Sequence, residues 1–195
     1  GPRPNLLDPK SGKNQKLIEV DHPILDNLDI EKIRNIDKFT SNKLRSVTLS
    51  ICYNKKENPN LEIENFLQSI CIEAERVINS DACNIIILSD REVDQNNIAI
   101  PALLATSSVH HHLIKKGLRT KVGLIIETGE ARRVHDLCLL AGYGAEAINP
   151  YLAFYTLSNI IKNHNQEIEE KEAYTKYIKA VTKGMLKVMS KMGIS

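Results

Sequence analysis

The sequence predicts an α/β fold in which parallel strands alternate with helices. Two short runs rich in β-branched residues, 84–90 and 121–127, have the composition of strands that are buried on both faces. Helix-like segments of 10–17 residues lie between successive strand-like segments. Such alternation implies parallel pairing with right-handed crossovers. The expected architecture is therefore an open sheet or part of a barrel.

The first elements follow from local patterns. Residues 1–20 hold three of the seven prolines and predict an extended lead-in. The stretch Asn-Leu-Asp at 27–29 offers an N-cap for a helix that carries isoleucines at helical spacing. Residues 44–53 alternate apolar and polar side chains, which predicts one strand. Residues 61–78 place their apolar side chains on one stripe, which predicts a helix.

Further along, helix and strand signals continue to alternate. A helix is expected over 101–117, with Pro101 in its first turn and Gly117 at its end. A second helix should end at Gly142, before a third buried strand at 145–149. Helix-like spacing then continues over 151–165.

The last part of the chain predicts an amphipathic helix after a charged segment. Residues 166–172 read as a solvated linker, and Gly184 weakens the helix that follows. Steps of four and three along this helix produce an apolar seam, which we expect to dock on the α/β body or on a following domain. The seam consists of Tyr174, Ile178, Val181, Met185, Val188 and Met192. The predicted organisation is a lead-in at 1–20, an α/β domain at 21–165, and a linker with an amphipathic helix at 166–195.

Composition argues against nucleic-acid and membrane partners. The formal net charge is +2, basic residues are mixed with acidic ones, and there is no Trp to stack on bases. No apolar run approaches the roughly 18 residues of a membrane span, and the beginning lacks the apolar core of a signal peptide. We therefore expect a soluble, intracellular protein.

The cysteines are too far apart to suggest a metal site. Zinc and iron–sulfur sites need close ligand pairs, and no two of these cysteines form a C-x-x-C pair. We expect them to be small buried hydrophobic residues in a reducing compartment. They are Cys52, Cys71, Cys83 and Cys138.

Three consecutive histidines, 110–112, stand inside the helix expected over 101–117. Successive helical residues point about 100° apart, so three in a row cannot converge on one metal ion. His110 shares a stripe with Leu103 and Ile114, whereas His111 and His112 fall toward the flanks. Packing and hydrogen bonding are therefore the favoured roles, ahead of a functional site.

The stretch GYGAEA at 142–147 formally matches a dinucleotide-binding fingerprint. That motif works only between a strand and the helix after it, where the helix N-terminus faces the pyrophosphate. Here the order is helix, then strand. We reject nucleotide binding and interpret Gly142 as a left-handed helix terminator.

Polar residues follow the predicted strands where a parallel sheet gathers ligands. Asp90 and Arg91 follow one strand, Glu127 ends the next, and Asn149 ends the third. These groups make a polar site possible, although they serve equally well as ion pairs and helix caps. The residues include no nucleophile–base pair and no phosphate-cradling glycine loop.

Long stretches of the chain resemble the large subunit of glutamate synthase. The stretches at 83–154 that carry the resemblance are CNIIILSD, PALLATSSVHHHLIKKGLRT and ETGEARRVHDLCLLAGYGAEAINPYLAF. The opening GPRPNLLDP, then DHPILDN, and the closing YIKAVTKGMLKVMSKMGIS look like the same family.

The resemblance implies the family's central domain, a partial and degenerate (β/α) barrel. In the family this domain joins a glutaminase domain to a barrel that binds FMN and an iron–sulfur cluster, and it helps frame the route of ammonia. The parent enzyme makes glutamate from glutamine and 2-oxoglutarate, with electrons from ferredoxin or NAD(P)H. The cytoplasm is the expected compartment, with a plastid as the alternative.

No catalytic, cofactor-binding or metal-binding residue carries over from the family to this chain. The parent enzyme's cofactors thus have no ligands here, and the isolated segment is expected to be inactive. Two alternatives stay open. One is a stand-alone α/β enzyme that uses Asp90, Glu127 and Asn149. The other is an interaction module derived from this domain.

Overall fold

The core of the molecule is a four-stranded parallel sheet. The computed structural model describes residues 17–54, 56, 62–163 and 168–194. Strands β1 (Ser46–Ser50), β3 (Ile85–Ser89), β5 (Gly123–Glu127) and β6 (Ala147–Asn149) are hydrogen-bonded in the order β1-β3-β5-β6. All three pairings are parallel, which confirms the predicted α/β class with parallel β-α repeats.

Residues 23–25, at the beginning of the predicted α/β domain, add to the edge of this sheet beyond β6. Leu25 N donates to Ile148 O at 2.9 Å, and Ile148 N donates to Pro23 O at 2.7 Å. Ile24 forms an isolated parallel bridge with Ile148. Residues 23–25 thus extend the parallel pairing next to the last strand in the sequence.

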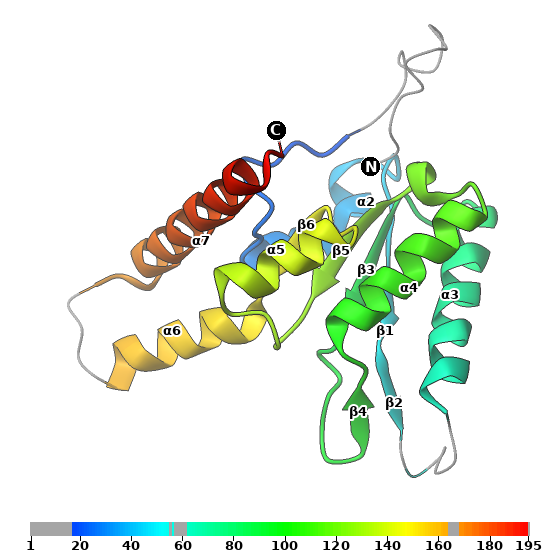
Figure 1. Ribbon diagram of the computed structural model, residues 1–195, viewed down its shortest axis with the longest axis horizontal. Coiled ribbons are helices and arrows are strands. Elements are labelled where there is room, and N and C mark those ends of the chain that lie inside the picture. Colours follow the sequence, from blue (N-terminus) through cyan, green and yellow to red (C-terminus); the bar gives the residue numbers. More distant parts are fainter. Residues whose placement is uncertain (1–16, 55, 57–61, 164–167, 195) are drawn as a thin grey trace, which may run out of the picture.

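Helices cover both faces of the sheet (Figure 1). The main core lies on one face, under α3 (Ile63–Asn79), α4 (Ala102–Lys115) and α5 (Val134–Gly142). The other face is covered by α1 (Asn27–Arg34), whose Ile30 and Ile33 pack against Ile85, Ile87 and Ile125. The remaining helical elements are α2 (Ile36–Phe39), η1 (Arg119–Lys121), α6 (Tyr151–Asn163) and α7 (Glu170–Met192).

The single strand predicted over 44–53 is wrong in one respect. The chain leaves the parallel sheet after Ser50, and β2 (Cys52–Asn54) pairs antiparallel with β4 (Asn97–Ala99) in a separate two-stranded sheet. The alternation of apolar and polar residues continues across the break at Ile51, so it could not reveal the change of partner. The three-residue β4 carries too short a pattern to be predicted.

Helix ends differ from the predictions in their capping groups. The N-cap of α1 is Asp26, one residue before the predicted cap, and its carboxylate accepts from Leu28 N and Asp29 N at 2.8 Å each. Pro101 precedes α4, and the Glu130 side chain accepts from Ala102 N at 2.8 Å in place of a local cap. The helix predicted to end at Gly142 begins at Val134, with Arg133 as its N-cap.

The left-handed glycine that follows α5 is Gly144 and not the predicted Gly142. Gly142 is still helical, whereas Gly144 has a φ of 114°. A Cβ at Gly144 would lie 2.1 Å from His110 Nδ1. The backbone turn and the close approach of the histidine ring therefore both depend on Gly144.

Helix α7 packs on α5 and α6, which confirms docking on the α/β body. Val181 and Met185 of the seam are buried, and the Tyr174 ring lies 4.8 Å from that of Phe154. The predicted seam is packed only in part, because its last residue, Met192, is 68% exposed. Part of the predicted linker, 170–172, forms the first turn of α7, and 166–167 lie outside the described residues.

Candidate functional site

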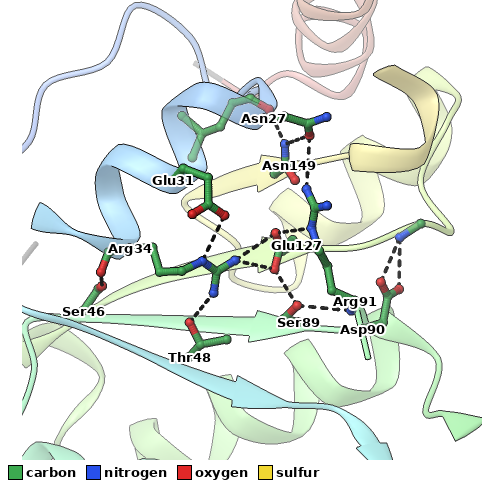
Figure 2. Close-up of polar contacts among 12 residues, drawn as sticks. Asn27, Glu31, Arg34, Ser46, Thr48, Ser89, Asp90, Arg91, Glu127 and Asn149 are labelled. Carbon is green, nitrogen blue, oxygen red and sulfur yellow. Dashed lines mark hydrogen bonds and ion pairs between the residues drawn. The ribbon is translucent and has the colours of Figure 1, made fainter. Parts of the chain in front are cut away.

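The carboxyl ends of the central strands bring the predicted polar residues together (Figure 2). The parallel register places Ser89 beside Glu127 and Glu127 beside Asn149. Asp90 and Arg91 follow Ser89 directly. The polar residues that follow the predicted strands therefore lie at one edge of the sheet.

Glu127 is the centre of this cluster and is fully buried. Its Oε1 accepts from Arg34 at 3.0 Å and from Arg91 Nε at 2.7 Å. Its Oε2 accepts from Arg34 at 2.9 Å and from Ser89 Oγ at 2.5 Å. Each carboxylate oxygen thus has two donors, and two guanidinium groups neutralise the buried charge.

Arg34 is the partner that the sequence did not reveal. It lies at the end of α1, 93 residues before Glu127. Its other nitrogens donate to Thr48 Oγ1 at 2.6 Å and to Glu31 Oε1 at 3.2 Å. The apolar pattern of α1 predicts a helix with a buried face, but it does not show that the last turn of that helix reaches the strand ends.

Arg91 is fixed by aromatic and amide groups as well as by Glu127. It donates to Tyr155 Oη at 2.8 Å and to Asn27 Oδ1 at 3.4 Å. Its guanidinium carbon lies 4.5 Å from the centre of the Tyr151 ring, within the range of a cation–π interaction. The side chain is therefore held on several sides.

Asp90 and Asn149 serve mainly to connect loops. The Asp90 carboxylate accepts from Thr128 Oγ1 at 2.5 Å and from Gly129 N at 3.0 Å. Asn149 donates to Leu25 O at 2.9 Å and to Asn27 Oδ1 at 3.1 Å. Its Oδ1 is buried and accepts no hydrogen bond within the part of the chain that the structure describes.

The electrostatics of the cluster keep Glu127 ionised. Burial alone would raise the pKa of Glu127, but the hydrogen bonds from Ser89, Arg34 and Arg91 outweigh it and hold the pKa below its ordinary value. Burial, together with the neighbouring Asp90, strongly raises the pKa of the Tyr151 hydroxyl, which therefore stays protonated.

An open hollow of about 570 Å³ lies against the cluster. It is lined by Glu31, Arg34, Thr48, Ser50, Ser89, Arg91, Glu92 and Glu127. Solvent in this hollow reaches the arginines, whose side chains are each 28% exposed, but not Glu127. The hollow is polar and occupies the place where parallel α/β sheets bind ligands.

The histidine triplet makes separate structural contacts. His110 Nδ1 accepts from Arg119 Nε at 3.0 Å, His111 Nδ1 lies 2.9 Å from Ser107 O, and His112 Nε2 lies 2.9 Å from Glu75. Across the described ranges, no group of three or more His, Cys, Asp or Glu side chains could hold a metal ion. Within those same ranges, no helix is both long and apolar enough to cross a membrane.

Comparison of sequences identifies long relatives of the chain. It is 40% identical over 195 residues to the glutamate synthase [NADPH] large chain of Bacillus subtilis. It is 36% identical over 204 residues to the glutamate synthase [NADH] of Saccharomyces cerevisiae. Both alignments cover the whole chain, which spans only 12% and 9% of the two relatives.

Comparison of structures supports the barrel-like arrangement. A double mutant of flavocytochrome b2 with pyruvate bound superposes with a TM-score of 0.53 over 88% of this chain and 49% of that chain. Sequence identity is only 11%, so the likeness concerns the fold alone. The model of the family described as the glutamate synthase central domain matches residues 1–195. The chain therefore belongs to the glutamate synthase central domain family.

Proposed function

We propose that this chain is a non-catalytic central domain of a glutamate synthase. In this role it joins the glutaminase domain to the FMN-binding domain and helps frame the passage of ammonia between them. The parent enzyme uses FMN and an iron–sulfur cluster to form glutamate from glutamine and 2-oxoglutarate. Family membership supports this assignment, as does the small share of each relative that the chain spans.

The saturated state of Glu127 is the observation that carries the non-catalytic role. A general base needs a free lone pair within reach of a proton and a pKa near the working pH. Each oxygen of Glu127 already accepts two hydrogen bonds, and the pKa of this carboxylate is lowered. The group therefore holds elements together and is poorly suited to proton transfer.

Substitution of the strand-end carboxylates in the full-length parent enzyme tests this role. We expect Asp90→Asn and Glu127→Gln to lower thermal stability but to leave kcat for glutamate formation within about threefold, measured well below Tm. A general acid or base contributes roughly 10²–10⁴-fold to a rate. A loss of that size in folded enzyme would support the alternative in which Asp90, Glu127 and Asn149 form an active site.

The purified 195-residue chain offers an independent check. We expect no flavin absorbance after incubation with FMN and no glutamine hydrolysis above background. In the only buried carboxylate–arginine cluster among the described residues, Glu127 is already paired with Arg34 and Arg91. Flavin retained through gel filtration would contradict the assignment of cofactor binding to another domain.

A further inference from the structure

The Glu127 carboxylate is held as a protein holds a bound anion. Two arginines and one hydroxyl converge on it at the carboxyl ends of parallel strands, beside an open hollow of about 570 Å³. We propose that the position between these donors, next to the hollow, is an anion site which the chain fills with its own side chain. The Glu127 carboxylate occupies the place of a small organic acid, and Glu127→Ala opens the site to a free carboxylate such as acetate.

Arg34 keeps most of its support when Glu127 is removed. Its donors to Thr48 Oγ1 at 2.6 Å and to Glu31 Oε1 at 3.2 Å do not involve Glu127. Ser46 Oγ also donates to the carbonyl of Arg34 at 3.1 Å, which ties the end of α1 to β1. The guanidinium group therefore remains directed at the strand ends.

Arg91 would also keep its other contacts when Glu127 is removed. Its hydrogen bonds to Tyr155 Oη and Asn27 Oδ1, at 2.8 and 3.4 Å, come from α6 and α1. The Tyr151 ring lies against the guanidinium at 4.5 Å. Two preorganised cations would thus face each other across the space that Glu127 leaves, and preorganisation lowers the entropy that binding has to overcome.

Charge and shielding from solvent both favour an anion in that space. The other carboxylates that line the hollow, Glu31 and Glu92, are exposed and screened by solvent, whereas the position of the Glu127 carboxylate is shielded from it. Asp90 is already satisfied by Thr128 and Gly129. Without Glu127, Arg34 would keep only its solvent-exposed ion pair with Glu31 at 3.2 Å among the residues that line the hollow, and Arg91 would lose its ion pair with Glu127.

The size of the missing group selects the ligand. Glu127→Ala removes Cγ and the carboxylate, which together have the heavy atoms of one acetate ion. Formate fills only the carboxylate position and leaves the space of Cγ empty, so it should bind less well. Glu127→Gln keeps the volume filled and removes only the charge. This variant is a matched control, because it destabilises the cluster without making room for a ligand.

Thermal denaturation of the full 195-residue chain near pH 7 tests the proposal. Wild type, Glu127→Ala and Glu127→Gln are compared from zero to about 0.5 M sodium acetate, with sodium chloride at the same ionic strength as the reference. If the highest concentration is about ten times Kd, acetate should raise the Tm of Glu127→Ala by roughly 3–6 °C beyond chloride. Formate should give a smaller rise, and wild type and Glu127→Gln should show none.

Two results would overturn the proposal. The first is a response of Glu127→Ala to acetate no larger than its response to chloride. The second is an equal response of Glu127→Gln, which would indicate a general effect of acetate. Should Glu127→Ala fail to fold without ligand, refolding in acetate must restore its native circular dichroism. Failure to refold at every acetate concentration, while Glu127→Gln folds, also counts against it. Because this experiment measures thermal stability, its outcome does not depend on whether this domain has a catalytic role in the parent enzyme.

Discussion

Glu127 joins parts of the chain that local sequence patterns cannot connect. Through Arg34 it holds the last turn of α1, and through Arg91 it holds the loop after β3. A buried ion pair adds little compared with an apolar replacement, but the loss of one partner is costly because the other charge is left uncompensated. The ion pairs of Glu127 with Arg34 and Arg91, called the lock below, therefore fix the position of α1 on the sheet.

The stability of the chain should depend on the ionisation of Glu127. Its pKa is lowered by folding, so its contribution is complete above the ordinary pKa of 4.5 and is lost as pH falls through the folded value. We expect Glu127→Gln to cost about 3 kcal/mol at pH 7. The difference between the two proteins should shrink below about pH 4.5. Urea denaturation across this pH range measures it, and a constant difference would contradict the lock.

Sequence patterns located most of the cluster but not its full set of partners. The strand-end residues Asp90, Arg91, Glu127 and Asn149 could be placed together because the carboxyl ends of parallel strands share an edge. The contact of Arg34 with Glu127 spans 93 residues and depends on which face of the sheet α1 covers. That choice follows from tertiary packing, which the spacing of isoleucines does not encode.

The histidine triplet should divide into one supporting residue and two minor ones. His110 accepts from Arg119, which also donates to Val122 O and Gly144 O, so the ring supports the contact between the α4–β5 connection and the turn before β6. We expect His110→Ala to cost about 1–3 kcal/mol. His111→Gln should change stability by less than about 1 kcal/mol, as at ordinary surface sites. Equal losses for both in urea titrations would refute this division.

At the scale of elements, the buried parallel strands were predictable and the small antiparallel sheet was not. Strands β3 and β5 are buried at every position, and their continuous β-branched runs reflect this. Strand β4 has three residues, none of them buried, and its partner continues the pattern of β1. Such short edge elements are determined by the chain next to them more than by their own composition.

Gly184 shows how a residue that weakens a helix can be required by packing. A Cβ at this position would lie 2.5 Å from Val134 Cγ2 on α5. We expect Gly184→Ala to destabilise the chain by roughly 1–3 kcal/mol through overpacking, although alanine favours helix by about 1 kcal/mol. The added Val134→Ala should restore much of this loss in a double-mutant cycle. Additive effects of the two changes would mean that α7 and α5 do not meet closely here.

At the scale of the whole molecule, a single helix covers the face of the sheet opposite the main core. Ile30 and Ile33 of α1 cluster with Ile85, Ile87 and Ile125, so this face is buried without further strands. The sequence predicted parallel β-α repeats, yet an open sheet and part of a barrel share the same local pattern. Whether a sheet closes into a barrel depends on contacts between segments far apart in the sequence. Local patterns therefore cannot distinguish an open sheet from part of a barrel.

Helix α7 completes the fold on the opposite side. Its Val181 and Met185 are buried, whereas Leu186 on the same helix is 60% exposed. We expect Val181→Ala and Met185→Ala to destabilise the chain by about 1–4 kcal/mol and Leu186→Ala by less than about 0.5 kcal/mol. Hydrogen exchange should show protected amides over 174–188. Rapid exchange there, or equal costs at all three positions, would mean that α7 does not pack on the body in solution.

The pairing of residues 23–25 with β6 also sets the order in which the chain can fold during synthesis. Leu25 and Ile148 are hydrogen-bonded partners but leave the ribosome more than 120 residues apart. Until β6 emerges, the segment before α1 lacks its strand partner, and the lock at Glu127 forms only after residue 127 has appeared. Contacts of such long sequence separation form slowly, because loop closure must precede the gain from pairing. The sheet edge therefore stays incomplete until late in translation, and the last step of co-translational folding should follow the synthesis of β6.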